Sequence, residues 1–189
     1  MDQVFAPWRI EWVEREGGND DIEGCVFCAF AGHDRERDRE RRVVARSPHA
    51  FVLLNNYPYN PGHVMVIPEP HTGDYRDLDE AVLLDHARLK QRTFDALDDG
   101  MGPDAYNAGL NLGGTAAGGS IEEHLHTHVV PRWEGDTNFM PVVADTSVIV
   151  EAVADTYDRL HEAFAAQAGA EFRGEDRAVE FEFEFDGND

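Results

Sequence analysis

Three histidines occupy every second position of the segment His124-Leu125-His126-Thr127-His128-Val129-Val130, whose composition is otherwise typical of a β-strand. Side chains of a strand alternate between its two faces, so the pattern predicts that the three imidazoles project from one side at intervals of roughly 6.5–7 Å. Imidazoles titrate near neutral pH, and a strand built only for stability has no reason to gather three of them on one surface. We therefore expect the chemistry of this protein at this row of histidines.

A loop of small residues precedes the row, in the segment Asn111-Leu112-Gly113-Gly114-Thr115-Ala116-Ala117-Gly118-Gly119-Ser120. Its glycines allow backbone N–H groups to turn toward a ligand and to approach it closely, as in loops that bind phosphate. Asn111 and Ser120 add neutral hydrogen-bond donors. A glycine-rich segment is also an ordinary hairpin loop. Its position directly before the histidines favours an anion site that brings a phosphate to an imidazole.

These two features together resemble the histidine triad family of nucleotide-binding proteins, whose members are nucleotidyl hydrolases and transferases. A second block, residues 51–68, is similar to the family's strand, Pro-Gly-His turn and following strand, with the turn at Pro61-Gly62-His63. Further matches resemble the branch of diadenosine tetraphosphate phosphorylases, also called ATP adenylyltransferases. They are Ala6-Pro7-Trp8-Arg9, Gly24-Cys25-Val26-Phe27-Cys28, Pro131-Arg132-Trp133 and Asn138-Phe139. The resemblance covers about residues 4 to 168.

The resemblance implies nucleotidyl transfer by double displacement on dinucleoside polyphosphates. His126 is expected to attack the α-phosphorus and to form a covalent nucleotidyl-histidine, which splits one difficult displacement into two easier ones. Phosphate or water then releases the nucleotide. His128 is expected to hydrogen-bond the phosphoryl or leaving-group oxygens.

The same resemblance implies a set of nucleotide-binding residues. Asn55 corresponds to the family's ribose-binding position. His63 corresponds to a histidine that supports the triad; the alternative is a buried, hydrogen-bonded histidine of the turn. Asn111, Gly119 and Ser120 are expected to hold the non-bridging phosphate oxygens, which is the stabilisation that usually dominates phosphoryl transfer.

Cys25 and Cys28 are the only cysteines of the chain. Two cysteines at this spacing could be a redox pair, half of a zinc site or a coincidence. A tetrahedral zinc site needs two more nitrogen or sulfur ligands. The resemblance implies that these are His71 and His124, which would make a structural zinc with no open position for water.

Two other functions also fit the motifs. The three triad histidines could themselves hold a catalytic zinc with a water in the fourth position, as in a metallohydrolase. That reading leaves the glycine loop and the Pro-Gly-His turn unexplained. A nucleotide-binding regulator without turnover needs the same pocket but no nucleophile, and the intact His126 counts against it.

The bulk composition describes an unusually acidic globular protein. Its 189 residues are 42% hydrophobic and carry a net charge of −22, with Lys90 as the only lysine. Such a surface is typical of a protein adapted to a saline cytoplasm, where screening suppresses self-repulsion. It argues against binding duplex DNA or RNA, which requires basic residues that neutralise phosphates. No stretch has the length of a membrane span or the apolar core of a signal peptide, so we expect a cytoplasmic protein without a membrane partner.

We predict an α+β fold in a single domain, an antiparallel sheet meander with two flanking helices, as in the histidine triad family. The domain would cover residues 25–168, after an extension at 1–24 and before an acidic tail at 169–189. We expect strands at 42–46, 49–55, 62–68, 105–112 and 123–131. We expect helices at 77–98, followed by Gly100, and at 145–168, followed by Gly169. The charged residues 33–42 indicate a solvated loop or helix turn.

The acidic tail contains a second alternating pattern, with Phe181, Phe183 and Phe185 separated by glutamates. Strict alternation predicts a strand with one apolar face, which would pack against the sheet or against a partner subunit. The family resemblance implies a homodimer, and the aromatic strand would offer additional apolar surface to it.

Overall fold

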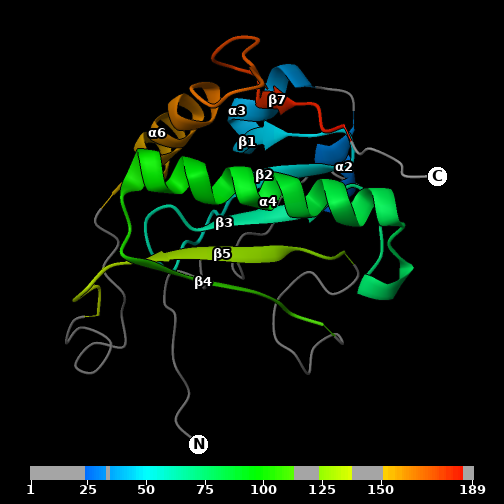
Figure 1. The fold of residues 1–189 in the computed structure, drawn as a ribbon, viewed down its shortest axis with the longest axis horizontal. Helices are drawn as coiled ribbons and strands as arrows, with labels where there is room; N and C mark the ends of the chain where they lie inside the picture. The colour runs from blue at the N-terminus through cyan, green and yellow to red at the C-terminus, as the bar shows by residue number, and fades with distance from the viewer. Residues whose placement is uncertain (1–23, 33–34, 113–123, 138–150, 185–189) are drawn as a thin grey trace, which may run out of the picture.

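The computed structural model describes residues 24–32, 35–112, 124–137 and 151–184 (Figure 1). Seven strands form one mixed sheet in the order β4-β5-β3-β2-β1-β7-β6. The strands are β1 (Val43–Arg46), β2 (Ala50–Leu54), β3 (Val64–Pro68), β4 (Ala105–Leu110), β5 (Thr127–Arg132), β6 (Ala170–Glu171) and β7 (Val179–Phe181). The helices are α2 (Val26–Ala31), α3 (Asp38–Arg41), α4 (Glu80–Met101) and α6 (Val153–Ala165), with 3-10 turns η2 (Arg35–Arg37) and η3 (Tyr75–Asp77).

The predicted α+β class is confirmed, and the sheet is more complex than a meander. β1, β2 and β3 are consecutive antiparallel neighbours, but β5 then pairs with β3 and leaves β4 at the edge. The tail adds β7 parallel to β1, which extends the sheet on the opposite side. The triad strand therefore lies inside the sheet, where β3 and β4 fix it from both sides.

Two long helices cover one face of the sheet, as Figure 1 shows for α4 and α6. Leu89 and Leu97 of α4 and Leu160 and Phe164 of α6 are fully buried in one cluster with the side chains that this face of the sheet presents. Gly100 lies inside α4 rather than after it, and a Cβ there would come within 3.3 Å of Ala163 and of the Arg159 carbonyl. The missing side chain thus lets α6 pack closely against α4.

The helix boundaries differ from the prediction for identifiable reasons. α4 continues to Met101 because Gly102, at φ +60°, adopts the left-handed conformation and donates its N–H to the carbonyls of Leu97 and Asp98. The second helix ends at Ala165, several residues before Gly169. Residues 145–150 of its predicted range lie outside the described residues, as does almost all of the predicted extension 1–24.

The opposite face of the sheet carries a second apolar cluster and the short helix α2. Phe27 of α2 packs there with Phe51, Leu53, Met65 and Ile67, which alternate along β2 and β3 with the residues of the first cluster. This is the face from which the triad histidines project, since Met65 lies opposite His128 in the register of β3 and β5.

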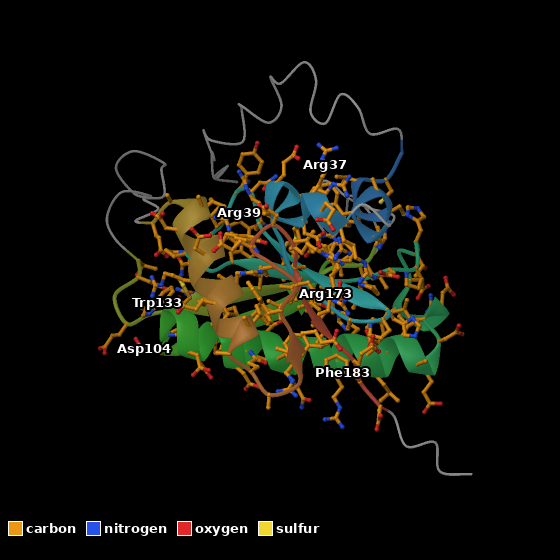
Figure 2. The ribbon with its side chains drawn as sticks, turned by 90° about the horizontal axis from the view of Figure 1, so that it is seen from above. Arg37, Arg39, Asp104, Trp133, Arg173 and Phe183 are labelled. Atoms are coloured by element: carbon orange, nitrogen blue, oxygen red, sulfur yellow. The ribbon has the colours of Figure 1, made fainter. Side chains whose placement is uncertain are left out.

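A buried ion pair connects the segment before β1 to α2 and to the segment before β7. The carboxylate of Asp38, which is 1% exposed, accepts hydrogen bonds from Arg46 and from the backbone N–H of Ala178. Arg46 also donates to the carbonyl of Phe30 at the end of α2. The expectation of a solvated segment at 33–42 is therefore wrong at Asp38, although Arg37 and Arg39 beside it lie toward the surface (Figure 2).

The tail forms a strand against the chain's own sheet. Phe181 of β7 is 2% exposed and packs against Phe164 of α6, with ring centroids 6.1 Å apart. Its apolar surface is thus not available to a partner, because α6 already covers it. Phe183 is half-buried, and Phe185 lies outside the described residues. No helix in the described ranges combines the length and the apolar character needed to cross a bilayer.

Candidate active site

The three triad histidines occupy the end of β5 nearest to α2. The strand begins at Thr127, so that His124 and His126 precede it and only His128 lies within it. The rings still lie on one side, since those of His126 and His128 are 4.9 Å apart and the edge of Phe27 contacts both His124 and His126 at 5.4 Å. His124 and His126 are buried, and His128 is half-buried.

The orientation of His126 is fixed by the backbone. Its Nδ1 atom lies 2.9 Å from the carbonyl oxygen of His124. A carbonyl oxygen can only accept, so Nδ1 carries the proton and Nε2 keeps its lone pair. A neutral imidazole with a free nitrogen of this kind is a competent nucleophile near neutral pH.

His128 is oriented by His63, through a contact of 2.9 Å between His63 Nε2 and His128 Nδ1. The backbone N–H of Tyr59 donates to His63 Nδ1 at 3.2 Å. His63 therefore holds its proton on Nε2 and donates it to His128, whose own proton must lie on the outward-facing Nε2. Burial, with a smaller contribution from His128, lowers the pKa of His63 to about 3 and keeps it neutral. The hydrogen-bond donor of the His128 ring is thus its Nε2–H.

Asn55 and Tyr59 surround this histidine pair. The Nδ2 atom of Asn55 lies 3.5 Å from His63 Nε2, and its Oδ1 accepts the backbone N–H of Tyr57. The ring of Tyr59 stacks on His63 with centroids 4.8 Å apart, and its side chain is 53% exposed. The predicted ribose residue therefore lies next to the histidines, at the end of β2.

The four predicted metal ligands come together. The donor atoms of Cys25, Cys28, His71 and His124 all lie within 4.8 Å of one another. Cys25 Sγ is 3.3 Å from His124 Nδ1, and Cys28 Sγ is 3.2 Å from His71 Nδ1. These spacings are close to those of a tetrahedron with Zn–S of about 2.3 Å and Zn–N of about 2.0 Å.

The tautomer of His124 also suits a metal. Its Nε2–H donates to the carbonyl of Pro68 at 2.8 Å, which leaves the Nδ1 lone pair directed at the two sulfur atoms. Two thiols and two imidazole nitrogens are a typical donor set of structural zinc. These four residues therefore fit a structural zinc ion.

The triad histidines, in contrast, do not converge on a common point. The Nδ1 atoms of His126 and His128 are engaged by the His124 carbonyl and by His63. Among the described residues, the only group of three or more potential ligands is the Cys25, Cys28, His71 and His124 cluster. The geometry gives no support to a catalytic zinc held by the triad.

A model of the HIT domain matches residues 36–135, more than half of the chain. The chain belongs to the histidine triad (HIT) family. It is 42% identical over 169 residues to the AP-4-A phosphorylase of Mycobacterium tuberculosis, an alignment that covers 88% of this chain and 86% of that protein. A Zn-bound histidine triad family protein from Mycobacterium smegmatis has the same fold, with a TM-score of 0.58, 27% identity and coverage of 75% and 94% of the two chains. A histidine triad nucleotide-binding protein from Sulfolobus tokodaii superposes with a TM-score of 0.58 at 27% identity, covering 74% and 91%.

Two predicted phosphate-binding residues of this HIT protein, Gly119 and Ser120, lie outside the described residues. Asn111 directly follows β4, whose Gly109 lies opposite His128 in the sheet, and its side chain is exposed. Asn111 thus lies at the end of the strand that pairs with the triad strand.

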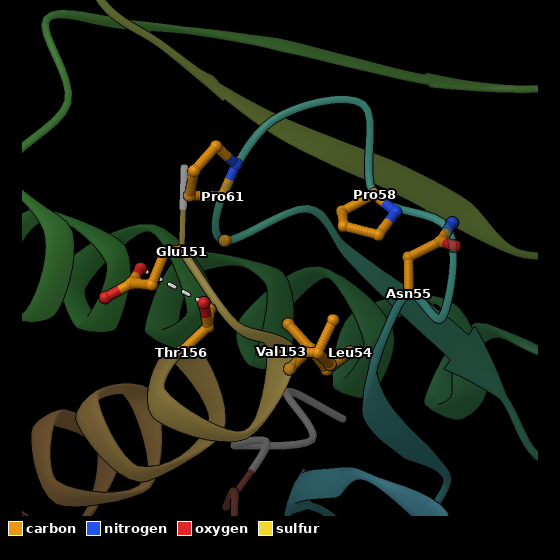
Figure 3. A pocket seen from close by; sticks show the side chains of 8 residues that line it. Leu54, Asn55, Pro58, Pro61, Glu151, Val153 and Thr156 are labelled. Atoms are coloured by element: carbon orange, nitrogen blue, oxygen red, sulfur yellow. Dashed lines mark hydrogen bonds between the residues drawn. The ribbon is translucent and has the colours of Figure 1, made fainter. Parts of the chain in front are cut away.

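A narrow pocket adjoins the HIT site without being part of it (Figure 3). It lies between the β2–β3 loop, with Asn55, Pro58 and Pro61, and the start of α6, where Glu151 accepts a hydrogen bond from Thr156. Of the residues that line this pocket, only Asn55 also lies beside the histidines of the HIT site. The pocket is too narrow to hold a nucleotide. We assign it to the packing of the loop against α6.

Sequence reasoning missed two contributors to this HIT site. Phe27 was part of the Cys25–Cys28 motif, but nothing in its spacing indicated that its ring contacts two triad histidines. Tyr59 acts through its ring, which stacks on His63, and through its backbone N–H, which every residue except proline has and no residue type could reveal.

Proposed function

We propose that this HIT protein cleaves dinucleoside polyphosphates, such as diadenosine tetraphosphate, through a covalent nucleotidyl-histidine intermediate. The observation that carries the proposal is the fixed orientation of His126, whose Nδ1–H donates to the His124 carbonyl and whose Nε2 therefore carries the lone pair. The similarity to an AP-4-A phosphorylase over 88% of the chain supports the substrate class.

In the first step, Nε2 of His126 attacks the α-phosphorus and forms a P–N bond. The bond between that phosphorus and the bridging oxygen breaks, and the nucleoside polyphosphate leaves. His128, which has its proton on the outward Nε2, donates to the leaving oxygen. Its acceptance of a hydrogen bond from His63 keeps the proton on the correct nitrogen.

In the second step, an oxygen of inorganic phosphate or of water attacks the same phosphorus and breaks the P–N bond. Phosphate as acceptor releases a nucleoside diphosphate, and water releases a nucleoside monophosphate. We favour phosphate, because the M. tuberculosis relative is a phosphorylase. In this proposal Asn55 binds the ribose, while Asn111, Gly119 and Ser120 hold the non-bridging oxygens.

We further propose that Cys25, Cys28, His71 and His124 hold one structural zinc. Bound there, zinc would contribute folding energy and would have no open position for substrate. Support comes from the convergence of the four donor atoms and from the Zn-bound relative of M. smegmatis. The ligands come from α2, from the segment after β3 and from the segment before β5, so the metal would join three parts of the chain.

We also propose a homodimer in a saline cytoplasm, without a nucleic-acid or membrane partner. β4 is an edge strand with one free row of backbone groups, and nearly all its side chains are exposed. Leu110 and Leu112 at its end are 36% and 48% exposed. A second copy added at this edge would cover both features.

One assay tests the enzymatic proposal. The protein is incubated at high salt with diadenosine tetraphosphate, with and without inorganic phosphate, and the released nucleotides are identified. ADP and ATP formed only with phosphate indicate the phosphorylase, and AMP and ATP the hydrolase. Binding without turnover under both conditions would refute the proposal in favour of a regulator.

A further inference from the structure

The motif Pro131-Arg132-Trp133, together with Asp136 after it, has no role in the mechanism above. Asp136 is nearly buried, with a side chain 10% exposed. Its carboxylate accepts two hydrogen bonds from Arg132, at 2.5 and 2.7 Å, and one from the backbone N–H of Trp133 at 3.2 Å. The Arg132 guanidinium also holds the pKa of this carboxyl well below its usual range. The turn after β5 thus closes around a carboxylate that stays ionised.

Asp136 reaches beyond its own turn to Asn60, in the loop between β2 and β3. The Nδ2 atom of Asn60 donates to Asp136 at 2.8 Å and to the carbonyl of Pro131 at 2.9 Å. Both hydrogens of the amide are therefore used, and both bind the end of the triad strand. We call these two contacts the Asn60–Asp136 clamp.

The clamp lies next to the histidine that orients His128. The carbonyl of Asn60 accepts the N–H of His63 at 3.1 Å, and Tyr59, the preceding residue, donates its N–H to His63 Nδ1. Gly62 has φ +77°, and a Cβ there would lie 3.1 Å from the ring of Pro131. The loop therefore packs closely against the end of β5, next to the clamp.

We propose that Asn60 and Asp136 are positioning residues for the His63–His128 pair. The clamp joins the loop that carries His63 to the strand that carries His128, and so fixes the 2.9 Å contact between the two imidazoles. Without it, His63 would shift relative to His128, whose proton would no longer be confined to the nitrogen that faces the substrate. Displacements of about 1 Å in such an arrangement can cost about 100-fold in rate. The inference rests on the proposed nucleotidyl transfer for its kinetic part only.

The test compares Asp136→Asn and Asn60→Ala with the parent protein. Asn60→Ala leaves the Arg132–Asp136 pair intact, so it isolates the clamp. Asp104→Asn is the matched control, because Asp104 (labelled with Trp133 in Figure 2) accepts the N–H of Glu134 in the same turn, whereas the Asn60 amide donates to Asp136 and Pro131. Folding of each variant is checked by its thermal transition at high salt.

We expect kcat for diadenosine tetraphosphate to fall by about 10- to 100-fold in both variants, with KM changed less than about threefold. The double variant should be little worse than the poorer single variant, because both changes act on the same hydrogen bond between Asn60 and Asp136. Asp104→Asn should keep kcat within about twofold. A folded Asn60→Ala protein with kcat near that of the parent would overturn the proposal.

A second measurement separates the clamp from the proposed reaction. In the ¹⁵N–¹H spectrum of the histidine side chains, the parent should show His63 and His128 as single Nε2–H tautomers. Both variants should show His128 averaged between tautomers, and Asp104→Asn should resemble the parent. If no dinucleoside polyphosphate is cleaved but the tautomers change, the proposed function fails and the clamp remains. Unchanged tautomers overturn the clamp whatever the rates are.

Discussion

The carbonyl oxygen of His124 accepts the Nδ1–H of His126 at 2.9 Å, while the ring of His124 belongs to the Cys25, Cys28 and His71 cluster. One residue thus presents its side chain to the proposed metal and its backbone to the proposed nucleophile. Both residues lie in the segment that leads into β5, which begins at Thr127. The proposed zinc would stabilise the backbone that orients His126 without touching the substrate.

Replacement of His126 tests the nucleophile. His126→Asn should abolish the covalent nucleotidyl-enzyme and lower turnover by at least about 10³-fold, since no other free imidazole nitrogen has the same position. His128→Asn should slow turnover less, because it removes a donor and not the attacking atom. Rapid quenching with labelled diadenosine tetraphosphate measures both quantities. Near-parental turnover of His126→Asn would contradict the assignment of His126 as the nucleophile.

Replacement of one zinc ligand tests the metal site. His71→Asn should release the metal, found as about one zinc per parent chain by elemental analysis, and should lower the melting temperature more than the rate of the chemical step. His49→Asn is the matched control, since His49 is an exposed histidine outside the cluster. A parent protein that contains no zinc and loses no stability with chelators would contradict the prediction.

The sequence was sufficient for the site where chemistry depends on residue type and spacing. The alternation predicted the histidine row, and the family resemblance added His71 and His124 to the Cys25–Cys28 pair. The fold brings these four ligands together, although they lie up to 99 positions apart. The sequence was insufficient where the pairing or the burial of a residue depends on the backbone or on a partner far away in the chain. The parallel pairing of β7 with β1 and the burial of Asp38 depend on tertiary contacts that a single strand or helix pattern does not encode.

The buried pair of Asp38 and Arg46 should dominate the stability of the N-terminal half. Asp38→Ala leaves the Arg46 charge buried without its partner, which should cost about 3–5 kcal/mol of unfolding free energy. The control is Glu40→Gln, because the Glu40–Arg37 pair is exposed and solvent-screened and should contribute far less. Denaturant titration at constant salt measures both changes. A loss below about 1 kcal/mol for Asp38→Ala would refute the prediction.

Acid should destabilise the protein through its buried histidines. Burial, with a smaller contribution from Lys90, lowers the pKa of His86 to about 4, whereas an unfolded histidine titrates near 6.5. Between these two values only the unfolded chain takes up the proton, so stability is retained above about pH 6.5 and falls as the pH decreases.

The expected loss from His86 between pH 7.5 and pH 5 is about 2 kcal/mol, since pH 5 lies about 1.5 units below the unfolded pKa. His63 should act in the same direction, because its pKa is lowered to about 3. His86→Gln should reduce the difference in unfolding free energy between the two pH values by about this amount, and His49→Gln should not. An unaltered pH dependence in His86→Gln would show that the buried imidazole does not titrate in this way.

Assembly and salt dependence are coupled through the net charge of −22 per chain. The apolar strand of the tail is covered by the chain's own α6, so the predicted dimer must use another surface, and the β4 edge is the exposed candidate. Carboxylates on both copies repel each other more strongly as the Debye length grows from about 3 Å at 1 M salt to about 30 Å at 0.01 M. We therefore expect a dimer at molar salt that dissociates or unfolds at millimolar salt, measured by sedimentation and by melting temperature across a salt series.

Leu110→Glu should prevent dimerisation even at molar salt, whereas Phe172→Glu, at another apolar side chain that is 56% exposed, should not. A monomer at every salt concentration would contradict the assembly, and a constant melting temperature would contradict the adaptation to salt.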